Sequence, residues 1–351
     1  MHFLGVPLSI LTTAICWGVY GVILSWGAAA MGEARLRSFL CVGLAYFLIA
    51  VIVPVLILRA KGEKGSWTAS GTWWSFNAGI LGALGALGII LALTSGGSPL
   101  YVMPLVFGGA PVINTFTTMV MTRNYRVNPM FLAGLILVIA GAACVLIFKP
   151  IIVNAHAQHA PLELEFIDWF KIVGSILLTV LTWGAYGPTL HKGQMAMQGS
   201  RLRPLICVGL AYFAIAVVIP AILIPLVEAD KSWTTSGFTW SLLGGTAGAI
   251  GALGIIMAFT FGGKPIYVMP LVFGGAPIIN TFFNLSMATE TRGGNTSIFY
   301  AGLMMSIIGA VTVLVFAPKG APHAPASASA EPVKKPESNE VPSDTIVKSS
   351  H

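Results

Sequence analysis

Ten long apolar stretches alternate with short polar stretches along the chain of 351 residues. A helix needs about 20 mainly apolar residues to cross the roughly 30 Å of hydrocarbon in a bilayer. The alternation therefore predicts an all-α, polytopic membrane protein with ten transmembrane helices. We expect these helices over residues 6–28, 36–58, 73–94, 99–121, 130–148, 169–190, 204–226, 239–261, 265–287 and 297–317.

The second five stretches repeat the first five at a constant offset of 166 residues. The segment PLYVMPLVFGGAPVINTF at 99–116 returns as PIYVMPLVFGGAPIINTF at 265–282, and residues 41–47 return unchanged as 207–213. Because the register holds without a gap from Trp17 to Phe116, the chain carries an internal duplication. The predicted organisation is a first five-helix repeat at 1–150, a linker at 151–168, a second five-helix repeat at 169–317 and a tail at 318–351.

Each predicted repeat crosses the membrane an odd number of times, so the second repeat starts on the opposite side. The two repeats are then inverted about an axis in the membrane plane, a common construction of secondary transporters. In the short loops, ten Lys and Arg residues lie on the N-terminal side and six on the other side. This bias predicts that both termini are cytoplasmic, in a protein of the plasma (inner) membrane.

Composition agrees with a membrane location. Hydrophobic residues make up 56% of the chain and charged residues 9%, whereas a soluble domain carries about 25% charged residues. The net charge of +7 is scattered, without the aromatic-interleaved basic patch of a nucleic-acid-binding protein, so membrane lipid and a small-molecule substrate are the expected partners. The tail, rich in Pro, Ala, Ser and charge, is predicted to be disordered and cytoplasmic.

The fourth and ninth predicted helices carry prolines and glycines on one face. Pro104, Gly108, Pro111 and Thr115 are spaced 4, 3 and 4 residues apart. Proline removes a backbone hydrogen bond, and the freed carbonyl is tolerated only against protein or a wet cavity. We therefore predict that kinks and gates form at Pro104, Gly108, Pro111, Pro270, Gly274 and Pro277. The alternative is a packing kink whose neighbouring Asn caps a backbone group.

Polar side chains inside the apolar stretches are the candidate substrate contacts. Trp and Tyr often lie in interfacial belts, but several of these fall mid-segment, where their polar atoms need partners. The candidates are Trp17, Tyr20, Tyr46, Tyr101, Asn114, Trp183, Tyr186, Tyr212, Tyr267 and Asn280. Glycines recur at every third residue of the third and eighth helices, from Gly79 to Gly88 and from Gly245 to Gly254, and predict close helix packing.

The sequence also argues against several kinds of chemistry. No Asp, Glu, Lys or Arg lies near the middle of a predicted span, which disfavours a proton-carrying carboxylate and capture of phosphate by a buried cation. The four cysteines form no CxxC pair, and His156 and His159 have no third ligand nearby. Without nucleotide-binding or hydrolase motifs, we expect no metal, no cofactor and no enzymatic activity.

The layout resembles the EamA-like members of the drug/metabolite transporter superfamily over about residues 1–318. The resemblance rests on the two five-helix units, Trp17-Gly18 and Trp183-Gly184, the double glycines at 96–97 and 262–263, and paired glycines in the fifth and tenth helices. It implies secondary transport by alternating access through a central cavity. The halves here are unusually alike and the tail is long, which departs from the family pattern.

The resulting hypothesis is a secondary transporter of a small neutral or zwitterionic metabolite, such as a sugar, an amino acid or a drug-like solute, acting as a monomer or homodimer. A non-transporting membrane sensor or scaffold is the main alternative, and an intramembrane enzyme is a third. A transporter requires a polar pathway between the repeats. A sensor or scaffold predicts a packed interior.

Overall fold

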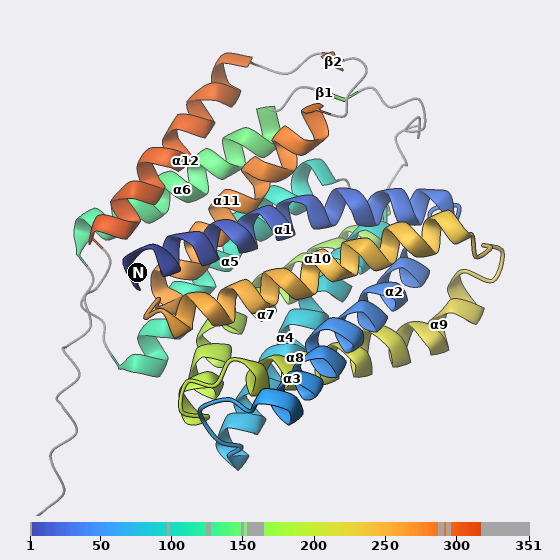
Figure 1. The fold of residues 1–351 in the computed structure, drawn as a ribbon. Coiled ribbons are helices and arrows are strands. Elements are labelled where there is room, and N and C mark those ends of the chain that lie inside the picture. The colour runs from blue at the N-terminus through green and yellow to red at the C-terminus, as the bar shows by residue number, and fades with distance from the viewer. Residues whose placement is uncertain are drawn as a thin grey trace, which may run out of the picture. The chain divides into compact units, whose positions relative to one another are not determined.

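A computed structural model of the chain describes residues 2–96, 99–123, 128–148, 151–152, 165–286, 291–292 and 296–316. The first half contains α1 (His2–Ala30), α2 (Arg35–Phe47), η1 (Leu48–Ile52), α3 (Val53–Lys61), α4 (Ala69–Thr94), α5 (Pro99–Thr122) and α6 (Pro129–Phe148). The second half contains α7 (Phe166–Ala196), α8 (Leu202–Phe213), η2 (Ala214–Val218), α9 (Ile219–Val227), α10 (Thr235–Thr260), α11 (Pro265–Ser286) and α12 (Thr296–Phe316) (Figure 1).

The regular secondary structure of the described chain is helical except for one pair of two-residue strands, β1 (Ile151–Ile152) and β2 (Thr291–Arg292), which are antiparallel. Within the described ranges, eight helical segments are long and apolar enough to cross a bilayer. They include α2–η1–α3 and α8–η2–α9, each as one continuous segment. This confirms an all-α protein of the integral membrane class. The shorter apolar helices α6 and α12 lie where the fifth and tenth helices are expected.

The second half departs from the predicted boundaries at α7. This helix starts at Phe166, inside the expected linker, and runs six residues past 190 to Ala196. His191 and Lys192, just past the expected end of the span at 190, are therefore helical residues. Residues 153–164 of the linker and the whole tail at 318–351 lie outside the described residues.

Two π-helical segments, η1 and η2, interrupt the second helix of each half at positions that differ by 166 residues. Each precedes a proline, Pro54 in one half and Pro220 in the other. Proline has no N–H to donate to the carbonyl four residues earlier, so the ladder can widen at this turn. The duplication has thus preserved a local irregularity that hydrophobic periodicity does not predict.

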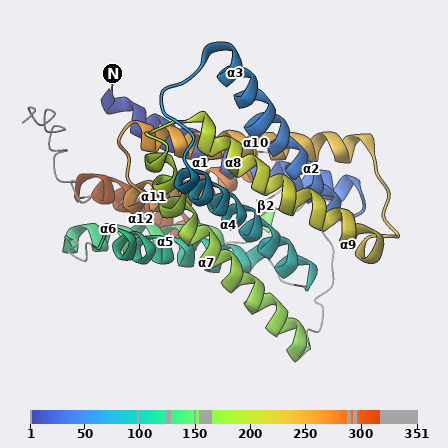
Figure 2. The ribbon, with the colours of Figure 1, turned by 90° about the horizontal axis from the view of Figure 1, so that it is seen from below.

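Helices of the two halves pack on each other rather than in separate domains. α1 lies along α10, α4 along α7, and α6 along α12 (Figures 1 and 2). Thr68, at the start of α4, donates a hydrogen bond of 3.0 Å to Ala196 O at the end of α7. Thr234, at the start of α10, donates one of 2.9 Å to Ala30 O at the end of α1. Both pairs are therefore antiparallel and built from the same contacts.

Candidate functional site

Six of the predicted aromatic site residues gather between the two halves. Tyr46 of α2 stacks on Tyr212 of α8 with ring centroids 3.8 Å apart and planes 5° apart. Trp17 of α1 lies 6.3 Å from Tyr186 of α7, between ring centroids. Trp183 and Tyr20 complete this group of six. Together with two phenylalanines described below, Phe107 and Phe273, they form what we call the aromatic cluster: Trp17, Tyr20, Tyr46, Trp183, Tyr186, Tyr212, Phe107 and Phe273.

Tyr20 joins the cluster through a glycine of α10. A Cβ placed on Gly248 would lie 3.4 Å from Tyr20 and 3.2 Å from Tyr46. In the other half, a Cβ on Gly82 would lie 3.4 Å from Tyr186 and 3.0 Å from the hydroxyl of Tyr212. The missing side chains of the glycine stripe thus make room for the tyrosine rings, which confirms the close packing predicted for these helices.

The two indoles of the cluster are held by reciprocal hydrogen bonds. Trp17 Nε1 donates to Gly248 O over 3.2 Å, and Trp183 Nε1 donates to Gly82 O over 3.0 Å. Each donor and each acceptor differs from its counterpart by 166 residues. The indole N–H groups are thereby satisfied inside an apolar region, and the ring positions are fixed.

Two phenylalanines that were not predicted belong to the same cluster. Phe273 of α11 lies 6.2 Å from Trp183 and 6.4 Å from Trp17, and Phe107 of α5 lies 6.3 Å from Phe273, all between ring centroids. Both occur in the repeated sequence VFGG. The repetition of this motif was the sequence signal that could have identified them as site residues. A phenylalanine in an apolar helix, however, is not by itself a sign of a site.

The two predicted asparagines lie at equivalent positions of α5 and α11, and each donates to a neighbouring helix. Asn114 Nδ2 donates to Pro265 O at the start of α11 over 2.9 Å, and Asn114 is fully buried. Asn280 Nδ2 donates to Gly18 O of α1 over 2.9 Å. Both amides therefore bond to the backbone of a neighbouring helix, as the alternative interpretation expected.

The predicted gate residues lie in continuous helices. α11 runs unbroken through Pro270 and Pro277, both buried, and α5 runs unbroken from Pro99 to Thr122. A Cβ on Gly274 would meet Val138 of α6, so this glycine serves helix packing. The side chains of Tyr101 and Pro104 lie outside the described atoms. Tyr267 bonds locally, its hydroxyl donating to Gly262 O over 3.4 Å.

A buried carboxylate closes one end of the α2–α8 pair. Glu63, whose side chain is 6% exposed, follows α3 and caps the start of α8 in the other half. It accepts hydrogen bonds from Ser200 Oγ at 2.6 Å and from the N–H groups of Arg201 at 2.9 Å and Leu202 at 3.1 Å. Arg203 Nη1 lies 3.7 Å from the same carboxylate. We call these five residues the Glu63 cluster.

The hydrogen bonds set the charge state of Glu63. Burial alone would raise the pKa of its carboxyl group, but hydrogen bonds from Ser200, from two backbone N–H groups and from the Arg201 side chain outweigh burial. The pKa therefore lies below its ordinary value of 4.5. The carboxylate is ionised at neutral pH, which suits a negative group at a helix N-terminus.

A second buried carboxylate closes the opposite end. Glu228, 5% exposed, follows α9 and accepts the N–H groups of Leu36 at 2.7 Å and Arg37 at 3.1 Å at the start of α2. Arg37 Nη2 in turn donates to Glu228 O at 3.0 Å and to Lys231 O at 2.7 Å. We call these four residues the Glu228 cluster.

The two clusters fix the relative direction of the equivalent spans. The start of α2 lies at the end of α9, and the start of α8 lies at the end of α3. The segments Arg35–Lys61 and Leu202–Val227 are therefore antiparallel, with the Tyr46–Tyr212 stack between their ends. From the sequence, Arg37 and Arg203 counted only among the loop charges that predict orientation in the membrane, and neither carboxylate was predicted as a functional residue.

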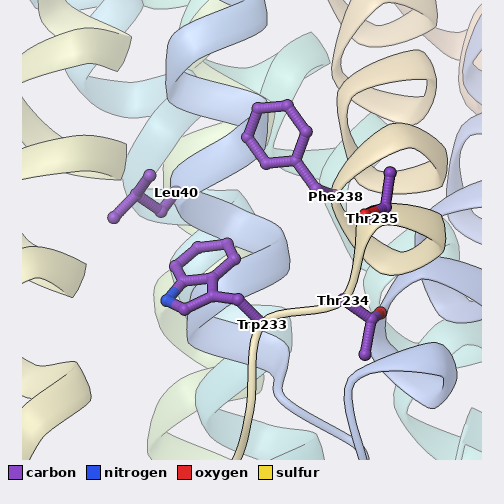
Figure 3. A pocket seen from close by; sticks show the side chains of 5 residues that line it. All are labelled: Leu40, Trp233, Thr234, Thr235 and Phe238. Carbon is purple, nitrogen blue, oxygen red and sulfur yellow. The ribbon is translucent and has the colours of Figure 1, made fainter.

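A surface groove of about 540 Å³ lies beside the Glu228 cluster and is lined by Leu40, Trp233, Thr234, Thr235 and Phe238 (Figure 3). The guanidinium carbon of Arg37 lies 5.1 Å above the Trp233 ring, a distance suited to a cation–π contact. The groove is mostly apolar and contains none of the predicted site residues.

No protein-family model and no curated protein matches the chain. Among solved structures, 26 chains match. One of them, a crystal structure of a protein, superposes with a TM-score of 0.61 at 16% sequence identity, covering 88% of this chain and 96% of that chain. At this identity the similarity establishes a shared fold.

Proposed function

We propose that this protein is a secondary transporter that moves a small neutral or zwitterionic solute across a membrane by alternating access. The proposed architecture has ten transmembrane helices in two inverted five-helix repeats, of the EamA-like kind that the sequence resembles. The proposed location is the plasma (inner) membrane, with both termini in the cytoplasm.

The observation that carries the proposal is the reciprocal, antiparallel pairing of the two copies. Equivalent spans run in opposite directions, and each carboxylate caps the first turn of the other copy's span. The reciprocal Trp17 and Trp183 bonds follow the same rule. A copy that points the other way in the bilayer is what an inverted repeat requires, and such repeats build many secondary transporters.

The two ends are closed by similar interactions, which limits the free-energy difference between the two states of the proposed mechanism. Each end is closed by a buried Glu that accepts two backbone N–H groups at a helix start and lies near an arginine. Both clusters are formed in this structure, so opening one end while the other stays closed breaks similar interactions in either state, and the free-energy difference between the two states can stay within a few kcal/mol. The aromatic cluster, between the ends, would contact the solute in both states.

Transport by the purified protein in proteoliposomes tests the proposal directly. We expect saturable counterflow of one class in a panel of labelled sugars, amino acids and nucleosides, and loss of that flux in the Trp17→Ala/Trp183→Ala double variant. Trp73→Ala is the matched control, because Trp73 is 65% exposed and outside the cluster. A folded protein that transports no member of the panel would instead favour a sensor or scaffold.

A further inference from the structure

Buried polar atoms without a hydrogen-bond partner are concentrated on two helices. In the part of the chain that the structure describes, ten such side-chain atoms occur, and six of them belong to α5 and α7. Buried polar groups are normally paired, and leaving one unpaired is costly. The six atoms are Asn114 Oδ1, Thr115 Oγ1, Thr118 Oγ1, Tyr186 Oη, His191 Nδ1 and Gln194 Oε1.

The two amides are oriented so that their oxygens stay open. Asn114, 0% exposed, uses its nitrogen to reach Pro265 O. Gln194, 1% exposed, donates from Nε2 to Thr260 Oγ1 at 2.8 Å and to Ile256 O at 3.2 Å. Since each NH₂ group is already bonded to a protein oxygen, rotating either amide would break existing bonds. Both carbonyl oxygens are thus held available to an outside donor.

Three of the open atoms belong to side chains that contact the ends of α10 and α11 around their connecting loop. Asn114 Oδ1 lies 3.3 Å from the position a Cβ on Gly187 would occupy, so it faces α7. Gly187, His191 and Gln194 are spaced 4 and 3 residues apart and share one face of α7. His191 meets the ring of Phe259 near the end of α10, with centroids 4.9 Å apart.

Thr118 lies one helical turn beyond Asn114 on α5. Tyr186 joins these residues to the aromatic cluster through its contact with Trp17. These residues reach from the aromatic cluster, at Tyr186, to the loop between α10 and α11, whereas Thr115 shares the face of α5 on which Gly108 points toward Ile139 of α6. We call the other five residues with open atoms the polar track.

The duplication does not reproduce two of the three α7 residues of this track. The positions equivalent to His191 and Gln194 are Ser25 and Ala28. Ser25 Oγ donates to Val22 O at 2.7 Å within its own helix, and alanine has no polar side-chain atom. The equivalent turn of α1 thus forms without an open atom, so the fold itself does not require a histidine and a glutamine here.

Thr115 of α5, which lies outside the polar track, differs from its copy in the same way. Thr281, the counterpart of Thr115, donates from Oγ1 to Pro277 O at 2.9 Å within α11. The counterpart of Thr118 is Asn284, whose side chain lies outside the described atoms. A threonine in this motif can therefore satisfy its own hydroxyl, yet the Thr115 hydroxyl has no partner in the described structure.

We propose that the polar track binds a neutral polyhydroxylated solute, a monosaccharide or a polyol, and that this is the solute class of the proposed transporter. Every open atom of the track is uncharged, and the set mixes two carbonyl acceptors, two hydroxyls and one imidazole nitrogen. Solute hydroxyls can donate to Asn114 and Gln194 and accept from Thr118, while the aromatic cluster contacts C–H faces. A carboxylate would meet the amide oxygens unfavourably, and an ammonium group would find no carboxylate among the five residues.

Thr118→Val gives the sharpest test, because it removes an unpaired hydroxyl with almost no change in shape. Binding is measured by tryptophan fluorescence of the purified protein, with glucose and mannitol as probes and leucine as the zwitterionic comparison. We expect the Kd for glucose or mannitol to rise about tenfold while the Tm of the unliganded protein is unchanged or higher. Thr281→Val, which removes a hydroxyl bonded within its own helix, is the control and should leave the Kd unchanged.

The outcomes separate this inference from the proposed transport. Polyol binding that Thr118→Val weakens, without any flux, would support the track and contradict the transporter. Leucine flux with no binding of glucose or mannitol would support the transporter and overturn the track. An unchanged Kd in both Thr118→Val and Gln194→Met would also overturn it, because neither hydroxyl nor amide would then touch the solute.

Discussion

Replacing Glu228 with alanine is expected to destabilise the protein far more than is usual for a loop residue. The carboxylate accepts two N–H groups at the start of α2, at 2.7 and 3.1 Å, and hydrogen bonds to charged groups contribute about 1.5–3 kcal/mol each. Removing one member of a buried ion pair costs about 3–5 kcal/mol. Arg37 keeps two carbonyl acceptors, so we place the loss near the lower end, at about 3 kcal/mol.

Thermal unfolding in detergent, followed by tryptophan fluorescence, measures this loss. A change of 1 kcal/mol shifts Tm by roughly 2–4 °C in proteins of 150–250 residues and by less in longer chains, so we expect a drop of roughly 4–6 °C in this chain of 351 residues. Asp230→Ala is the control: its carboxylate pairs with Lys231 but Asp230 is 73% exposed on its side chain, and such pairs contribute little. Equal melting temperatures for the two variants would refute the assignment of Glu228 as a structural cap.

Three further predictions concern the other cluster and the aromatic site. Hydrogen bonds outweigh burial and hold the pKa of the Glu63 carboxyl group below 4.5. The stability that this carboxylate contributes is therefore present above pH 4.5 and is lost as the pH falls through the lowered pKa. The Tm should consequently fall more steeply with decreasing pH for the wild type than for Glu63→Gln. Gly85→Ala places a Cβ on the indole of Trp183 and should cost about 1–3 kcal/mol in thermal unfolding, whereas Gly174→Ala, with nothing within 4 Å, should gain about 0.5–1 kcal/mol. Trp17→Phe removes the hydrogen bond from Nε1 to Gly248 O of α10 and should cost about 1 kcal/mol and slow counterflow, and an unchanged rate would remove this indole from the site.

Eight of the ten expected spans and the duplication could be predicted, because composition and residue order determine both. Apolar length identifies membrane helices, and near-identical segments reveal the repeat whatever the fold. The aromatic cluster could be predicted in part, because Trp and Tyr carry polar atoms that need partners inside an apolar segment. Phe107 and Phe273 carry none, so their sequence positions do not distinguish them from lipid-facing residues.

The end clusters could not be predicted from the repeat. At the offset of 166, Glu228 aligns with Gly62 and Glu63 aligns with Ala229, so the carboxylates fall one residue out of register. Each loop follows its own path and still brings a carboxylate to a helix start 138 to 192 residues away in sequence. Such contacts depend on how the two halves meet, which no local pattern contains.

The same limit applies to η1 and η2 and to the asparagines. A π-helical turn changes the backbone ladder without changing the hydrophobic pattern, and only the following proline hints at it. Asn114 and Asn280 stand in the same motif and lie beside equivalent glycines, Gly187 of α7 and Gly21 of α1. The backbone groups that their amides bond, on α11 and α1, come from tertiary packing, which the motif alone does not contain.

The opposite orientation of the two repeats is the central claim, and labelling of two equivalent positions tests it most directly. Lys64 and Asp230 differ by 166 residues, and both are exposed in loops beside the two end clusters. In a variant without the four native cysteines, Lys64→Cys and Asp230→Cys are introduced singly, and right-side-out vesicles are treated with a membrane-impermeant thiol reagent. We predict that Asp230→Cys reacts in intact vesicles and that Lys64→Cys reacts only after permeabilisation. Reaction of both cysteines from the same side would contradict the inverted repeat and the alternating-access mechanism built on it.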